Sequence, residues 1–131
     1  MKTLDTNMVV RLLIGDDPQQ TPIAERAFLE AVASGGVYLP DVVLAEVAWV
    51  LRGYDLGRSE RYGLLERLVR TRGVVVDDID AVIEALDLFR QGGDLADQLI
   101  LARAASAAAL PVLSFDKRFA EQQGVERLGG S

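Results

Sequence analysis

The clearest structural signal in this chain is KTLDTNMVVRLL, residues 2–13. It predicts a short strand over residues 2–5 that stops at the carboxylate of Asp5, followed at once by a helix over residues 7–15. In open α/β sheets, functional groups gather where a strand ends and the chain turns into a helix. We therefore expect Asp5 to project from the edge of a sheet into a crevice.

The rest of the chain alternates short apolar runs with longer amphipathic ones. Short β-branched runs predict strands, and apolar residues at helical spacing between glycine or proline breaks predict helices. This alternation indicates an α/β fold with three layers, a short parallel sheet flanked by helices on both faces, in one domain over residues 1–131. The further predicted strands cover residues 37–39, 74–76, 112–114 and 125–128, and the further predicted helices cover residues 21–34, 41–52, 58–72, 78–91 and 95–109.

The composition excludes several kinds of catalytic site. Of the 131 residues, 50% are hydrophobic and 26% are charged, which is the balance of a folded globular protein. The chain contains no Cys and no His. Disulfides, thiolate metal sites, a Ser-His-Asp triad and His-ligated zinc are therefore excluded. An enzyme of this composition must rely on carboxylates, with a hard cation such as Mg²⁺ as their partner.

The charge balance bears on the partners. A net charge of -6 argues against a long basic groove for nucleic acid. Bound cations can nevertheless turn an acidic pocket into a site that binds phosphate. No N-terminal segment has the length or apolarity of a signal peptide, and no run reaches membrane-spanning length. We therefore expect a cytoplasmic protein with no membrane partner.

Glu46 is the only charged residue in the run VVLAEVAWVL, residues 42–51. A helix that is apolar almost all round is usually buried, and an unpaired buried carboxylate is costly. A bound metal ion would remove that cost, so we favour a functional role for Glu46. The alternative is that Glu46 lies on a narrow solvent-exposed stripe, or pairs with Arg11 or Arg52.

Three more acids lie at the starts of helices or the ends of strands. Asp94 is a good N-cap for the helix over residues 95–109, and this role is sufficient to explain it. Asp97 in the first turn complements the helix dipole, although a ligand role is an equal alternative. Asp116 repeats the arrangement at Asp5, because it directly follows a short apolar strand. Taken singly, Asp5 and Asp116 each fit a capping role better than a ligand role.

The joint pattern changes the interpretation. If four carboxylates converge without cations, they repel one another strongly. One or two Mg²⁺ or Mn²⁺ ions remove the conflict, because these hard cations prefer oxygen ligands. Two metal ions can clamp a phosphodiester and lower the pKa of the attacking water. The candidate catalytic and metal-binding residues are Asp5, Glu46, Asp97 and Asp116.

At these residues the sequence resembles the PIN-domain ribonucleases, in particular the VapC-type toxins of type II (VapBC) toxin–antitoxin pairs. The resemblance runs nearly end to end, and its first and third segments are specific when taken together. The segments that carry it are LDTN (4–7) with VVRLL (9–13), Glu46 in its apolar helix, GDLADQLI (93–100) and LSFDK (113–117).

The resemblance assigns roles to individual residues. The acidic quartet of the family falls on Asp5, Glu46, Asp97 and Asp116, and Asp94 is an additional acid. The family usually has Thr where Ser114 stands, and Ser keeps the hydroxyl. Where the family has Ala after the third acid, this chain has Gln98, which we expect to alter only the rim. The residues that match positions holding ligands or water are Thr6, Asn7 and Ser114.

The resemblance also implies an activity and partners. It implies acids at the carboxyl end of a parallel sheet, and Mg²⁺- or Mn²⁺-dependent endonucleolytic cleavage of RNA by activated water, which leaves a 5′-phosphate. It further implies a homodimer and a VapB-like antitoxin that covers the site. Basic residues near the acids are expected to hold RNA phosphates, although each also fits an ordinary surface charge; these are Arg11, Arg52, Lys117 and Arg118.

Other functions stay open at the level of sequence. A phosphorylatable receiver domain has a similar parallel sheet and strand-end acids, and Lys117 could serve as its lysine. It would need a phospho-accepting Asp directly after the third strand, where Asp77 lies too late, and it leaves Glu46 unexplained. A non-catalytic binding module and a PIN nuclease of RNA processing are further alternatives. Nothing in the sequence distinguishes RNA from DNA as the substrate.

Overall fold

The computed structural model describes residues 1–129, and every strand and helix predicted from the sequence is present in the predicted order. Among these residues, no helix combines the length and apolarity needed to cross a membrane. The elements are β1 (Lys2–Thr3), α1 (Thr6–Ile14), α2 (Gln20–Ala33), β2 (Val37–Tyr38), α3 (Asp41–Val50), η1 (Leu51–Gly53), α4 (Arg58–Arg70), β3 (Val74–Val75), α5 (Ile79–Arg90), α6 (Leu95–Ser106), β4 (Val112–Ser114), η2 (Phe119–Glu121) and β5 (Val125–Arg127).

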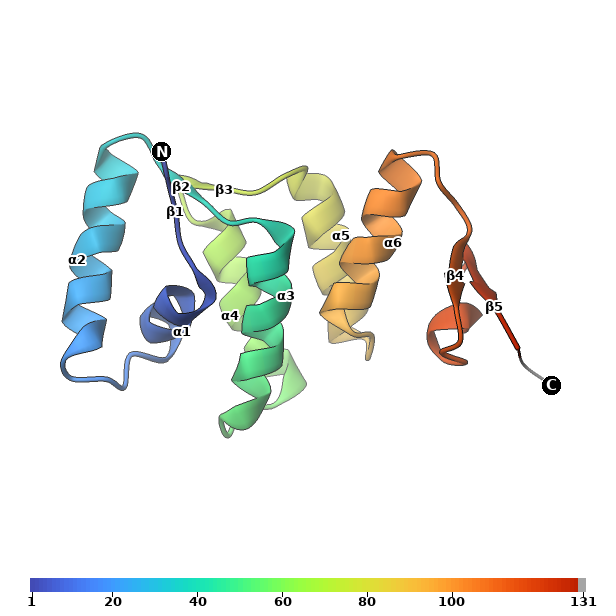
Figure 1. The fold of residues 1–131 in the computed structure, drawn as a ribbon. Helices are drawn as coiled ribbons and strands as arrows, with labels where there is room; N and C mark the ends of the chain where they lie inside the picture. Colours follow the sequence, from blue (N-terminus) through green and yellow to red (C-terminus); the bar gives the residue numbers. More distant parts are fainter. Residues whose placement is uncertain (130–131) are drawn as a thin grey trace.

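All strands are parallel, and they form two sheets. One sheet has the order β1-β2-β3, and the other consists of β4 and β5. Figure 1 shows the two sheets well apart, with α5 and α6 between them. The predicted α/β fold with parallel strands is therefore confirmed. Within the described chain β1 and β4 are not paired with each other, so each keeps one free edge.

The hydrophobic core lies beside the three-stranded sheet and continues between the helices. Figure 1 shows α2 on one side of this sheet and α3 and α4 on the other. Helix α3 is central, because it contacts α1, α4 and α6. Its inward face consists of Val43, Leu44, Val47 and Ala48, which are all buried. The largest fully buried side chains are Leu39, Leu44, Leu51, Leu65, Leu86, Val9, Val37, Val47 and Val82.

The C-terminal sheet is less covered than the N-terminal one. Leu113 on β4 is 59% exposed and Phe115, just after it, is 77% exposed. Two-stranded sheets are marginally stable alone, and edge strands with exposed apolar residues are ready to pair with another strand. The free edge of β4 and these two side chains leave a surface that another element could cover.

Candidate functional site

Asp5 and Asp94 cap helices, as the capping interpretation of the sequence expects, and Asp116 makes the same kind of bond in the turn before η2. One oxygen of Asp5 accepts a hydrogen bond from the backbone N–H of Met8 at 3.0 Å, so Asp5 is the N-cap of α1. Asp94 caps α6 by accepting from the N–H of Asp97 at 3.1 Å. Asp116 accepts from the N–H of Phe119 at 3.0 Å. Each cap uses one carboxylate oxygen, and the second makes no hydrogen bond within residues 1–129.

Asp94, Asp97 and Asp116 line one pocket of about 450 Å³ between the start of α6 and the segment after β4. Asp97 is half-buried there. Burial raises the pKa of the Asp97 carboxyl above its ordinary value of 3.8, and the neighbouring charges of Asp94 and Asp116 raise it further. The structure therefore brings two members of the predicted quartet, and the additional acid, to one place. Arg118 also lines this pocket.

The turn at Gly92 and Gly93 forms the wall of this pocket and leaves no room for larger residues. Gly92 has φ +120°, and a Cβ there would lie 2.6 Å from the guanidinium Nη2 of Arg118. A Cβ at Gly93 would lie 2.6 Å from Nε2 of Gln98 and 3.1 Å from the carbonyl oxygen of Leu88. Gln98 is only 2% exposed. The expectation that Gln98 lies at the rim is wrong, because the turn packs directly on its amide.

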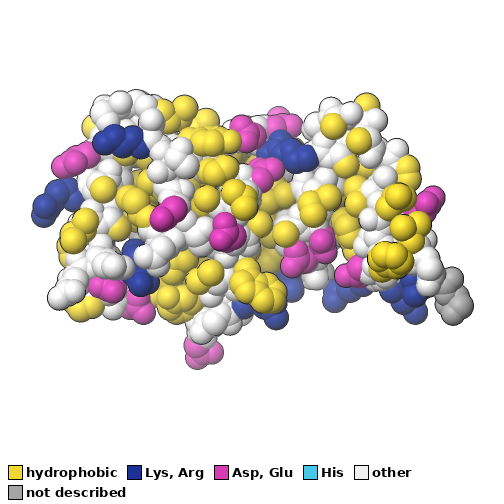
Figure 2. Space-filling model, viewed as in Figure 1, with side chains coloured by type: hydrophobic (Ala, Val, Ile, Leu, Met, Phe, Trp, Pro, Cys, Tyr) yellow, Lys and Arg dark blue, Asp and Glu magenta, His cyan; other side chains and the backbone are white. Residues whose placement is uncertain are grey.

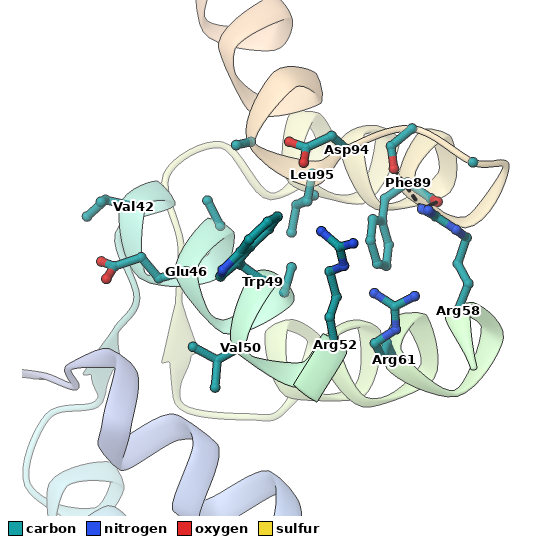
Figure 3. A pocket seen from close by; sticks show the side chains of 15 residues that line it. Val42, Glu46, Trp49, Val50, Arg52, Arg58, Arg61, Phe89, Asp94 and Leu95 are labelled. Atoms are coloured by element: carbon teal, nitrogen blue, oxygen red, sulfur yellow. Dashed lines mark hydrogen bonds between the residues drawn. The ribbon is translucent and has the colours of Figure 1, made fainter. Parts of the chain in front are cut away.

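Glu46 is exposed, so the interpretation that it is buried in an apolar helix is wrong. Its neighbours one turn away, Val42 and Val50, are 62% and 40% exposed, and the solvent-stripe alternative describes this face of α3. Glu46 makes no ion pair with Arg11 or Arg52 in the described part of the chain. In Figure 3 its carboxylate points away from Arg52. This face of α3 is apolar and exposed, since no other element among residues 1–129 covers it.

Asp5 lies in a third place, a shallow pocket of about 300 Å³ between α1 and α2 that Asn7 and Arg11 also line. The guanidinium of Arg11 donates to Oε1 of Gln20 at 2.6 Å and lies 3.6 Å from a carboxylate oxygen of Asp17. Arg11 therefore joins the two helices.

The remaining auxiliary and basic candidates surround these pockets. Thr6 is the half-buried first residue of α1. The hydroxyl of Ser114 accepts a hydrogen bond from the N–H of Asp116 at 3.0 Å, which fixes the turn at the end of β4. Lys117 and Arg118 are both exposed after that turn.

The four acids of the predicted quartet are divided among three pockets. Asp97 and Asp116 share one, Glu46 lines a second and Asp5 lines a third. No group of three or more acids among residues 1–129 lies close enough to hold a metal ion. Figure 2 shows acidic side chains spread along one face of the molecule. The donor atoms suit a hard cation, but their spacing in this structure does not, because β1 and β4 lie apart.

One feature that sequence reasoning missed is a pocket of about 610 Å³ lined by Arg52, Arg58 and Arg61, with Trp49 and Phe89 (Figure 3). Of these three arginines, only Arg52 is among the residues that the sequence predicts to hold RNA phosphates. Arg58 and Arg61 are three residues apart on α4 and so share one helix face. This spacing is the signal that could have identified them.

A family model described as PIN domain matches residues 2–125. The matched stretch includes all four acids of the predicted quartet and every element except the last residues of β5. No curated protein and no solved structure matches the chain at a significant level.

Proposed function

Because the chain belongs to the PIN domain family, we propose that it is an endoribonuclease that depends on Mg²⁺ or Mn²⁺, and that it is the toxin of a type II toxin–antitoxin pair. PIN domains are typically nucleases that use divalent metal ions and act on nucleic acid. The observation that carries the proposal within this chain is the single pocket that Asp94, Asp97 and Asp116 line together. We treat residues 1–131 as a single PIN domain.

The like charges in this pocket support a cation as its ligand. Burial and the two neighbouring carboxylates raise the pKa of Asp97, which means that its charged form is destabilised without a counter-charge. A bound divalent ion would supply that charge and acidify a water molecule. Asp97 and Asp116 would hold the ion, and Asp94 would keep Asp97 oriented through the hydrogen bond at the start of α6.

Asp5 and Glu46 would join the site if the C-terminal sheet approached the N-terminal one. Two observations support such a movement. β1 and β4 are both edge strands of parallel sheets, and each leads into an acid. Leu113 and Phe115 expose apolar surface that pairing would cover. In a parallel pair, the carboxyl ends of the strands lie at the same edge. Pairing of β1 with β4 would therefore bring Asp5 toward Asp116, in reach of Thr6, Asn7 and Ser114.

The toxin role rests on the resemblance to VapC-type proteins. The resemblance implies two partners, a second copy of the chain and a VapB-like antitoxin that blocks the acids. Exposed apolar residues add support, since Val42 of α3 and Ile100 of α6 line one shallow pocket and are 62% and 52% exposed. A surface of this kind suits a protein partner better than water.

Cleavage of total RNA tests the enzymatic part. The full chain is incubated with RNA in Mg²⁺ or in EDTA, and the cut ends are mapped. We expect internal cuts with 5′-phosphate ends that form only with the cation and disappear in Asp97→Asn. Absence of cation-dependent cuts, or equal cutting by Asp97→Asn, would contradict the proposal.

Expression in a bacterial host tests the toxin part separately. We expect growth arrest that the Asp97→Asn variant does not cause. Co-expression of its VapB-like antitoxin should restore growth. Cleavage in vitro without any growth defect would remove the toxin role and leave the nuclease.

A further inference from the structure

We propose that the pocket lined by Arg52, Arg61 and Trp49 binds an unpaired RNA strand, with a phosphodiester at the two guanidinium groups and a base stacked on the indole. This inference rests on the proposed nuclease function, because it names where the substrate strand lies before it reaches the acids. The pocket has a volume of about 610 Å³ and opens on the surface between α3, α4 and the start of α6 (Figure 3).

The guanidinium groups are available for an anion. Arg52, Arg58 and Arg61 form no ion pair with any acid in the described chain. Arg58 is used structurally, because its Nη1 donates to the carbonyl oxygens of Phe89 and Gly93, both at 2.7 Å. Nε of Arg61 is buried and has no hydrogen-bond partner among residues 1–129. A buried donor without a partner is costly. Arg61 is half-buried and lines the pocket, so an anion there would supply the counter-charge that its guanidinium lacks.

The positive charge is concentrated against the trend of the whole chain. The net charge is -6, yet three arginines face one pocket. Burial lowers the pKa of Arg61, and the charges of Arg58 and Arg52 lower it further. These like charges repel one another until an anion arrives, so anion binding would relieve a destabilising interaction already present in the folded chain.

Trp49 supplies the stacking surface. Its side chain is 63% exposed, which is unusual for the largest apolar residue. The guanidinium of Arg52 lies 4.4 Å from the centre of its ring and covers one face. The exposed remainder can take a base. Aromatic rings beside a positively charged groove are the usual way in which proteins hold single strands without reading their sequence.

The arginine pocket is joined to the acid pocket. Gly92, Gly93 and Asp94 line both of them. A strand whose phosphates lie at Arg52 and Arg61 would need to pass only this turn to reach Asp97. Gly92 and Gly93 have no side chain, so no side chain of this turn stands between the two pockets. Glu46 lines the same pocket but points away from Arg52 in Figure 3, so it leaves the anion position free.

These observations favour RNA over an acidic protein segment. Three features coincide, namely two free guanidinium groups, an exposed indole and a shared wall with the acids. An acidic peptide would use the first, but neither the exposed indole nor the adjacency to the acids. A base-paired duplex would use the charge and leave the indole without a partner, since its bases are already stacked.

Fluorescence of Trp49 gives a direct readout, because it is the only tryptophan in the chain. The full chain is titrated in EDTA, so that no cleavage occurs, with a single-stranded RNA of about ten nucleotides. The competitors are the same RNA as a duplex and a hexaglutamate peptide. The double variant is Arg52→Gln with Arg61→Gln. The matched control is Arg67→Gln, which changes an exposed arginine on α4, the helix that carries Arg61. Circular dichroism checks that each variant folds.

We expect quenching by the single strand, a loss of affinity of at least tenfold in the double variant and none in Arg67→Gln. The slope of binding against salt should fall by about 0.7, since the two guanidinium groups hold one phosphodiester and each phosphate contact on a single strand contributes roughly 0.7. Trp49→Ala, followed by the anisotropy of labelled RNA, should also bind more weakly.

Equal binding by the double variant would overturn the inference, as would a duplex that binds as tightly as the single strand. Hexaglutamate binding more tightly than RNA would assign the pocket to a protein partner instead. The result also separates this inference from the proposed nuclease. Tight binding in EDTA without cleavage in Mg²⁺ would contradict the nuclease and support the pocket, and normal cleavage with unchanged binding in the double variant would contradict the pocket alone.

Discussion

Arg103 of α6 binds Asp41 at the start of α3 through two parallel hydrogen bonds, from Nε at 2.6 Å and from Nη2 at 2.8 Å. The same Nη2 donates to the carbonyl oxygen of Asp77 at 2.7 Å. This pair fixes the helix that carries Asp97 against the helix that carries Glu46. The pair therefore supports the site from beside it: both side chains line the shallow pocket of Val42 and Ile100, and neither lines the three pockets that hold the acids of the predicted quartet.

Arg103→Lys should destabilise the fold. Lysine keeps the charge but cannot donate two parallel bonds to a carboxylate. Because both side chains are about 30% exposed or less, we expect a loss of about 1 to 2 kcal/mol in the free energy of unfolding. Urea denaturation measures it. Arg67→Lys on the exposed surface of α4 is the control. Equal losses of unfolding free energy in the two variants would show that the paired hydrogen bonds from Arg103 to Asp41 are unimportant.

Asp97→Asn should abolish cleavage with little change in fold. The amide keeps the shape of the side chain but cannot hold a divalent ion as a carboxylate does. We expect a loss of roughly 100-fold or more, as for removal of one charge-stabilising group. Asp16→Asn is the matched control, because Asp16 is exposed and makes no side-chain hydrogen bond or ion pair in the described chain. Wild-type rates for Asp97→Asn would exclude it from the site.

The metal-free protein should show a pH dependence that comes from Asp97. Its pKa is raised in the folded state above 3.8, so the folded chain binds this proton more tightly than the unfolded chain. The stability of the fold then falls as pH rises from 3.8 through the raised pKa of Asp97. Above that pKa the loss of stability is complete. We expect the stability of the wild type relative to Asp97→Asn to increase as pH is lowered from 7 toward 4. Thermal melts in EDTA measure this difference, and a difference independent of pH would refute the assignment.

Two glycine substitutions should have opposite effects. Gly93→Ala places a Cβ 2.6 Å from Gln98 and 3.1 Å from the backbone of Leu88, and we expect a loss of about 1 to 3 kcal/mol as for overpacked cores. A Cβ at Gly63 on α4 would have no other residue's atom within 4 Å. Gly63→Ala should therefore raise the free energy of unfolding by about 0.5 to 1 kcal/mol through helix propensity. Urea denaturation compares them. Stabilisation by Gly93→Ala would mean that the turn is not packed on Gln98.

Local features of this chain could be predicted, because they depend on neighbouring residues. The strand that stops at Asp5, the helix break at Gly35 and Gly36, and the cap at Asp94 all follow from spacing and capping preferences. The order of strands and helices and the parallel pairing followed as well.

Long-range packing could not be predicted in the same way. Glu46 was interpreted as buried because the run around it is apolar. Burial depends on which element covers that face of α3, and none of the described elements does. The separation of β4 from β1 depends on how α5 and α6 pack between the two sheets. The pocket of Arg58 and Arg61 forms only when α4 meets the turn at Gly93.

The most direct test of the central claim is the affinity for Mn²⁺ of the wild type and of Asp5→Asn, Glu46→Gln, Asp97→Asn and Asp116→Asn, measured by titration calorimetry with Asp16→Asn as the control. If the four acids form one metal site, each of the four variants should bind Mn²⁺ at least tenfold more weakly than the control. Unchanged affinity in Asp5→Asn and Glu46→Gln would show that these two acids do not share the cation, and unchanged affinity in all four would contradict the account.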